Sequence, residues 1–266
     1  MKNLEGKVAI VTGGTGGIGR GVALELAVRG ALVVISGRSA SKAEAVLAEI
    51  RQFGGEGDFI AGDVRSKADM DALAAETARR HGGIDILVAN AGGNDDEARR
   101  SDVRGPFGDI DLARVCAVVA ENIAAKLLPV QSALPFMRER GAGAVVFVTS
   151  EGGRVPTPTQ TAVATFAGGL ISASKVLSKE LARDRIRVNC VCVTVVRDSP
   201  SWRAAFECAD GVSDRHRKQY ERIIANSPLG VASPPDIGRV VAFLASDEAG
   251  YLTGATISPT GGLTIH

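Results

Sequence analysis

Short β-branched runs alternate along this chain with longer segments whose apolar residues recur at helical spacing. The runs that predict strands are residues 8–11, 31–35, 84–88, 144–148 and 186–189. Helical spacing is found at 43–53 and 68–80, and the segments 115–138 and 163–182 are apolar on more than one side. This repetition predicts an α/β fold, in which a doubly wound parallel sheet carries helices on both faces.

Segment 195–233 interrupts this alternation of predicted strands and helices, because it is polar, charged and rich in turn-forming residues. It starts just after the last predicted strand, at the edge where open α/β sheets bind their ligands. We therefore expect one domain over residues 1–266, with an excursion at about 195–233 that covers a substrate.

Composition narrows the class of protein. The chain has 266 residues, of which 45% are hydrophobic and 23% charged, and this balance is typical of a globular core. Lys and Arg number 31 and Asp and Glu 30, so the net charge of +1 gives no reason to expect nucleic acid or an anionic membrane as a partner. The four cysteines and three histidines show no metal-type spacing. Neither a signal-type start nor an apolar run of ~18 residues is seen, so we expect a cytoplasmic protein.

A glycine-rich turn follows the first predicted strand and leads into a helix over about residues 20–29. Its sequence over residues 12–19 is TGGTGGIG. Glycines permit a tight turn and a close approach of the backbone to a pyrophosphate, while the helix N-terminus offers unpaired N–H groups to the anion. The residues predicted to bind a dinucleotide here are Gly13, Thr15, Gly17, Ile18 and Gly19.

The end of the second predicted strand bears on which dinucleotide is bound. An acidic residue there would accept a hydrogen bond from the ribose 2′-hydroxyl of NAD. This chain instead has Ser36 and a nearby Arg38, and a guanidinium pairs well with the 2′-phosphate of NADP. We therefore expect NADP(H), with Ser36 and Arg38 at its 2′-phosphate.

Nearly the whole chain resembles the classical short-chain dehydrogenase/reductase (SDR) family. Residues 12–19 resemble the family's TGxxxGxG, Asp63 and Val64 its adenine-contacting pair, and Asn90, Ala91 and Gly92 its NAG segment. Asn122 and Ser150 match its active-site Asn and catalytic Ser. The resemblance implies a single Rossmann-type domain, cofactor contacts from these residues, catalysis by Ser150 and Asn122, and a homotetramer or homodimer.

The family's catalytic Tyr-x-x-x-Lys is missing from the matching position. A register without gaps between Ser150 and Asn189 puts Val163 at the Tyr position and Ala167 at the Lys position. The competing register, with Ile171 and Lys175, leaves too few residues for the helix before 186. Tyr is absent in either register, and the chain's two tyrosines, Tyr220 and Tyr251, lie far away in sequence.

Three functions follow from this departure. The first is NADPH-dependent reduction of a C=C bond conjugated to a carbonyl, as in an enoyl thioester of CoA or a carrier protein. There the charge develops on an enolate oxygen, which Ser150 stabilises, and no Tyr is needed to protonate a carbonyl. The second is a carbonyl reductase or alcohol dehydrogenase with a substitute acid. The third is a non-catalytic NADP-binding partner subunit or sensor. Candidates for the substitute acid are Thr159, Gln160, Thr161, Thr165 and His216.

Overall fold

The computed structural model describes residues 2–92, 97–207 and 214–266, with the backbone alone described for 214–216. The side chain of His216 therefore lies outside the described part. A seven-stranded sheet of order β3-β2-β1-β4-β5-β6-β7 organises the molecule, and every neighbouring pair is parallel. The strands are β1 (Val8–Thr12), β2 (Leu32–Gly37), β3 (Glu56–Ala61), β4 (Ile86–Ala89), β5 (Gly143–Ser150), β6 (Ile186–Val193) and β7 (Thr256–Ile257).

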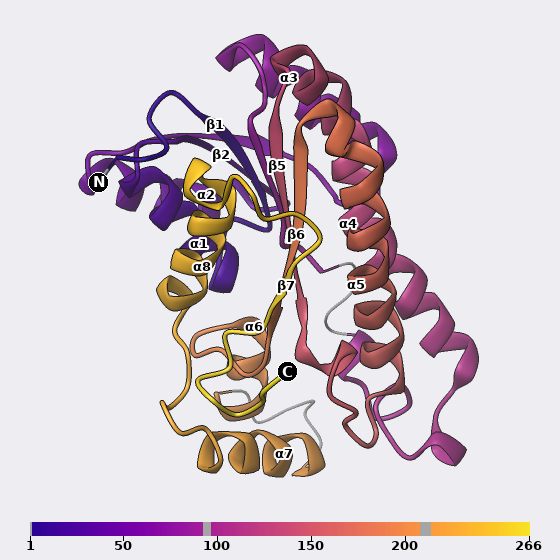
Figure 1. Ribbon diagram of the computed structural model, residues 1–266. Coiled ribbons are helices and arrows are strands. Elements are labelled where there is room, and N and C mark those ends of the chain that lie inside the picture. The colour runs from indigo at the N-terminus through magenta and orange to yellow at the C-terminus, as the bar shows by residue number, and fades with distance from the viewer. Residues whose placement is uncertain (1, 93–96, 208–213) are drawn as a thin grey trace.

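Helices cover both faces of the sheet, as the sequence pattern predicts (Figure 1). One face carries α1 (Gly17–Val28), α2 (Ala40–Gln52) and α8 (Pro234–Ala245). The other carries α3 (Lys67–His81), α4 (Leu112–Arg140) and α5 (Thr161–Leu181). Strand order reverses direction at β1 and β4, so a crevice opens between the carboxyl ends of these two strands.

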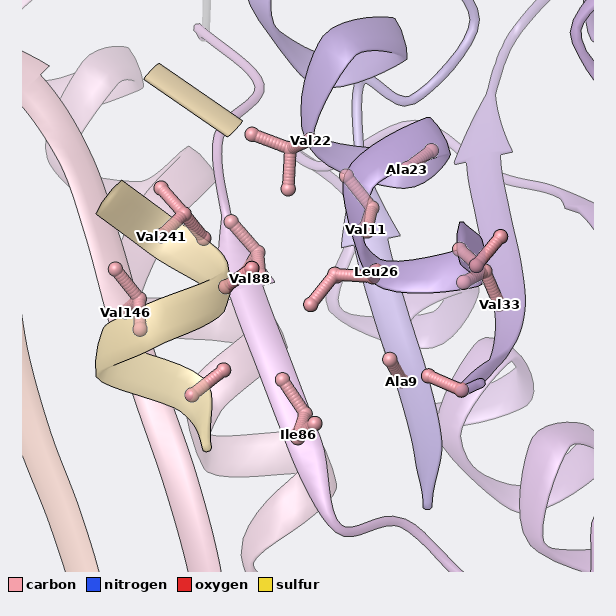
Figure 2. Close-up of a cluster of buried hydrophobic side chains, with 14 of the residues drawn as sticks. Ala9, Val11, Val22, Ala23, Leu26, Val33, Ile86, Val88, Val146 and Val241 are labelled. Atoms are coloured by element: carbon pink, nitrogen blue, oxygen red, sulfur yellow. The ribbon is translucent and has the colours of Figure 1, made fainter. Parts of the chain in front are cut away.

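The core is split between the two faces because side chains alternate along each strand. Ala9 and Val11 of β1 pack with Leu26 of α1 and Val241 of α8, as Figure 2 shows. Ile10, between them in sequence, belongs to the cluster on the opposite face. Both faces of β1 are thus buried, which explains why its sequence is a continuous apolar run.

Two strands were not foreseen from the sequence. β3 is the edge strand of the sheet, and its exposed ends and half-buried middle give no apolar run. β7 is two residues long and pairs with Cys190 and Val191 at the other edge. Edge strands bury less surface, so their sequences carry a weaker hydrophobic signal.

Segment 195–233 leaves the sheet after β6 and returns before α8. It contains α6 (Pro200–Phe206) and α7 (Asp214–Ala225), which lie together beyond the carboxyl edge of the sheet (Figure 1). An isolated parallel bridge joins Val196 to Ala232, and the Arg197 amide donates to the Ala232 carbonyl at 2.8 Å. The two ends of the segment are therefore held side by side.

One helical segment of the described chain, Thr161–Asp184, is long and apolar enough to cross a membrane by length and composition alone. The sequence contains no uninterrupted apolar run of ~18 residues, because Ser, Thr and Gly are interspersed in this segment. Its mean hydropathy is nevertheless high enough to meet the criterion. A core helix of a soluble protein meets the same criterion. Here the segment packs against α4, β5 and β6, and 28% of the stretch is buried.

Candidate cofactor and substrate site

A cavity of about 1100 Å³ opens at the carboxyl ends of the strands and extends under α6 and α7. Most of the residues predicted from the sequence line it: Gly13, Thr15, Gly17, Ile18, Arg38, Asp63, Val64, Asn90, Ala91, Gly92, Asn122 and Ser150. Gly19 and Ser36 are not on its surface. The cavity therefore joins the predicted cofactor residues to the predicted catalytic residues.

Gly19 supports the glycine-rich turn by close packing. A Cβ at this position would lie 2.1 Å from the carbonyl oxygen of Gly13, whose own φ of +67° favours glycine. Gly16, at the start of α1, provides no side-chain cap, and the first turn of α1 holds no acidic residue. The N–H groups and the positive end of the helix dipole thus face the cavity, and they fit the pyrophosphate of a dinucleotide.

The end of β2 presents positive charge to the same cavity. Arg38 and Lys42 both line it. Close by, hydrogen bonds from Arg65 hold the pKa of Asp63 at about 2, and the charge of Arg38 also lowers this pKa. Ser36 lies behind the wall, since its hydroxyl is buried and has no hydrogen-bond partner. Arg38, rather than Ser36, is therefore placed to meet an anion.

Behind the cavity, the end of β4 is locked to the end of β1. Asn90 donates from its side-chain amide to the Thr12 carbonyl at 3.0 Å, and its backbone amide donates to the Thr12 hydroxyl at 3.0 Å. Lys126 of α4 is 5% exposed and donates from its ammonium to the Asn90 carbonyl at 2.6 Å. Sequence reasoning missed Lys126, although its spacing of four residues from Asn122 places both on one helix face.

Ser150 ends β5, and its hydroxyl oxygen accepts a hydrogen bond from the Gly152 amide at 3.1 Å. The O–H of Ser150 thus has the cavity side available for donation. Asn122 is buried on α4 and donates to the Val118 carbonyl at 2.9 Å. A Cβ built on Gly152 would lie 3.4 Å from the Ser150 hydroxyl oxygen and 3.1 Å from a Val163 methyl. Val163 therefore stands beside Ser150 on the cavity wall.

The residues of the competing register lie elsewhere. Ile171 is part of the core cluster against β5 and β6, and Lys175 is on the exposed side of α5. Ala167 is fully buried, and a Cβ on Gly153 would lie 2.6 Å from its carbonyl carbon. Among the described residues that line the cavity, α5 supplies Val163 and Phe166.

Of the candidate substitute acids, Gln160 lines the cavity, while Thr159, Thr161 and Thr165 do not. Thr165 is exposed and donates to the Thr161 carbonyl at 2.8 Å. Tyr220, distant in sequence from Val163, reaches the cavity wall from α7. Tyr220 reaches the cavity wall only in the complete fold, so no local sequence pattern predicts its position.

Glu151 is a buried carboxylate directly after Ser150, and it also lines the cavity. It accepts hydrogen bonds from the Ser258 hydroxyl at 2.6 Å and the Thr264 hydroxyl at 2.9 Å, and it pairs with His266. These contacts bring residues after β7 onto the wall beside Ser150. Among the described residues, no group of His, Cys, Asp and Glu is arranged to hold a metal ion.

A glycine-rich turn at a helix N-terminus, a parallel sheet with a crevice at its switch point, and a hydroxyl beside that crevice define a dinucleotide-binding oxidoreductase. The family model described as "Enoyl-(Acyl carrier protein) reductase" matches residues 13–264. Together with the relatives below, this match shows that the chain belongs to the classical short-chain dehydrogenase/reductase family and has its Rossmann fold.

Two curated relatives match essentially end to end. The 7alpha-hydroxysteroid dehydrogenase of Clostridium sardiniense is 33% identical over 100% of this chain and 96% of that protein. The 3-oxoacyl-(acyl-carrier-protein) reductase FabG of Haemophilus influenzae is 32% identical over 98% of this chain and 100% of that protein. Both names describe oxidoreductases, and we assign this chain to that class of enzyme.

Solved structures agree with this assignment. Levodione reductase superposes with a TM-score of 0.86 at 28% identity, covering 97% of this chain and 98% of that chain. A 7α-hydroxysteroid dehydrogenase complexed with NADH and 7-oxo glycochenodeoxycholic acid superposes with a TM-score of 0.85 at 26% identity, covering 98% and 96%.

Proposed function

We propose that this enzyme uses NADPH to reduce a C=C bond conjugated to a carbonyl, as in an enoyl thioester of CoA or a carrier protein. The observation that carries the proposal is the hydrocarbon side chain of Val163 beside Ser150. A valine cannot protonate a carbonyl oxygen, and removing a positioned acid typically costs ~100–10,000-fold in rate. Reduction of the C=C bond avoids this loss, because its last proton is delivered to carbon.

The side chains of the site supply charge stabilisation and positioning. When bound, NADPH supplies the hydride, which adds to the β-carbon of the substrate. Ser150, held through the Gly152 amide, donates its O–H to the oxygen on which the enolate charge develops. Val163 and Phe166 make this part of the wall apolar, which strengthens the hydrogen bond by lowering the local dielectric.

NADP(H) is the cofactor that the described cations favour. Arg38 and Lys42 follow β2, where an NAD-type site would have an acidic residue. The similar hydroxysteroid dehydrogenase structure contains NADH, so family membership alone does not decide between NAD(H) and NADP(H). The residues after β2 are therefore the basis for proposing NADP(H). We further propose a cytoplasmic homotetramer or homodimer, in which the exposed apolar side of α5, including Val176, packs against another subunit.

Carbonyl reduction is the second candidate, and Tyr220 on the cavity wall is the observation that favours it. A phenol from α7 would then replace the missing acid. The names of the two curated relatives describe enzymes of hydroxysteroid and 3-oxoacyl chemistry, in line with this alternative.

Two matched N-acetylcysteamine thioesters separate these candidates, one α,β-unsaturated and one with a 3-keto group. We expect NADPH oxidation with the unsaturated thioester, and a loss of ~100-fold or more in Ser150→Ala. Val163→Tyr should leave this reaction in place and begin to permit reduction of the keto compound.

Turnover of the keto thioester alone, abolished in Tyr220→Phe, would replace our proposal by the second candidate. Binding of NADPH without turnover of either thioester would indicate a partner subunit or sensor that has lost catalysis.

A further inference from the structure

Arg104 forms part of the cavity wall where the loop between β4 and α4 meets α7. Its Nη2 donates to the Gln219 side-chain oxygen at 2.8 Å, and the guanidinium lies close enough to the Tyr220 hydroxyl for that group to affect its pKa. Its backbone amide donates to the Arg100 carbonyl at 2.8 Å, and its neighbours Val103 and Gly105 are buried. The side chain is therefore held at a fixed place on the wall.

Among the described residues, no carboxylate balances the charge of Arg104. Both of its side-chain partners, Gln219 and Tyr220, are neutral, and in the described chain no carboxylate lies within ion-pair distance of it. Burial lowers the pKa of its guanidinium below the usual range, and the nearby charge of Arg99 acts in the same direction. Arg104 is half-buried, and a cation partly removed from water is stabilised when an anion reaches it.

Two nearby arginines that do not line the cavity, Arg100 of the same loop and Arg114 of α4, are paired with a carboxylate. Arg100 donates to Asp102 at 3.1 Å, and Arg114 lies 3.2 Å from the same carboxylate. Three acidic side chains on the cavity wall have other partners: Glu49 pairs with Arg20, Asp63 with Arg65 and Glu151 with Ser258 and Thr264. A fourth, Asp198, acts on the charge of Arg20. Arg104 thus differs from these two arginines in lining the cavity with no carboxylate within ion-pair distance among the described residues.

We propose that Arg104 binds an oxyanion carried by the substrate, a carboxylate or a phosphate, at the end of the cavity formed by α7. A guanidinium suits this task because its N–H groups pair with two oxygens of such a group at once. Gln219 and Tyr220 orient it, so that only substrates long enough to reach from Ser150 to α7 gain the contact. The inference rests on the proposed function for the reacting end of the substrate.

Two pairs of thioesters test the anion site and identify its source. One pair is the N-acetylcysteamine thioester of 2-hexenedioic acid and its 6-methyl ester, which differ by one carboxylate. The other is 2-hexenoyl phosphopantetheine and 2-hexenoyl pantetheine, which differ by one phosphate. We expect one anionic member to have a kcat/KM at least ~30-fold above its neutral partner, since a buried charge pair is worth this much or more.

Variants separate recognition of the anion from a structural role of Arg104. Arg104→Met should abolish the preference for the anionic member of each pair, seen as the loss of the kcat/KM ratio between the two members. Gln219→Glu should do the same while keeping the arginine, because it places a carboxylate on the existing 2.8 Å contact. Arg100→Met is the matched control, as Arg100 is exposed, already paired and not on the cavity wall.

Calorimetric titration with the saturated thioesters gives a readout that needs no turnover. Binding that depends on charge and on Arg104, without turnover, would support the anion site and refute the proposed reaction. Turnover without a charge preference in either pair would overturn the anion site. A charge preference that persists in both Arg104→Met and Gln219→Glu would overturn it as well.

Discussion

The ammonium of Lys126 donates to the backbone carbonyl of Asn90 at 2.6 Å, and both residues line the cofactor cavity. Asn90 in turn holds Thr12, which precedes the glycine-rich turn. One lysine of α4 therefore supports the ends of both strands that flank the crevice.

Replacing this lysine should weaken both folding and cofactor binding. In Lys126→Met a buried charged hydrogen bond is lost, and we expect destabilisation by about 1–3 kcal/mol together with a higher Kd for NADPH. Thermal unfolding and fluorescence titration measure the two effects. Lys175→Met is the control, because Lys175 is exposed on α5. Loss of NADPH binding in Lys175→Met, with binding intact in Lys126→Met, would contradict the role given to Lys126. It would instead indicate that Lys175 corresponds to the catalytic lysine of the family.

Gly19→Ala should disrupt the turn that receives the pyrophosphate. The new Cβ would lie 2.1 Å from the Gly13 carbonyl oxygen, so α1 must move away from the turn. We expect a loss of about 1–3 kcal/mol or more and little NADPH binding. Gly16→Ala is the comparison for stability, since no atom lies within 4 Å of its added Cβ. Equal melting temperatures for the two variants would rule out the packing role given to Gly19.

The charge of Arg38 should determine the preference for NADPH. Arg38→Ala removes the cation that lines the cavity after β2, and we expect the Kd for NADPH to rise about tenfold or more. The Kd for NADH should not change, because NADH has no 2′-phosphate. Arg51→Ala controls for general charge, since Arg51 is exposed and paired with Glu44. An unchanged NADPH Kd in Arg38→Ala would refute this assignment.

Asp63 should contribute to stability in a defined acidic window. Its pKa in the folded protein is about 2, chiefly through hydrogen bonds from Arg65, whereas an unfolded Asp has a pKa of about 3.9. The stabilisation is therefore present above about pH 4 and is lost as the pH falls towards 2. Acid unfolding of the protein without cofactor should show a smaller pH dependence across this window for Asp63→Asn, and likewise for Arg65→Met. A pH dependence identical to that of the unsubstituted protein in both variants would exclude the Asp63–Arg65 pair as its source.

The parts of the fold that the sequence predicts are those with local signals. β1 and β2 are buried on both faces, so their apolar runs are continuous, and the glycine-rich turn depends on neighbouring residues alone. β3 was missed because Glu56 and Asp58 interrupt its pattern at an exposed edge. The substrate end of the cavity escaped prediction for a different reason. Arg104 and Gln219 are 115 residues apart, and only the complete fold brings them together.

The cofactor turn and the segment that carries α6 and α7 belong to different parts of the chain, and they meet where Pro200 lies against Gly17. The turn after β1 and the locked end of β4 belong to the sheet, whereas α6 and α7 belong to a segment whose two ends meet at the bridge between Val196 and Ala232. A segment closed at its base can change length and sequence with little strain on the sheet. Substrate preference can therefore change when 201–231 is grafted from another member of the family, provided that Ser199 and Pro200, which lie against Gly17, are kept.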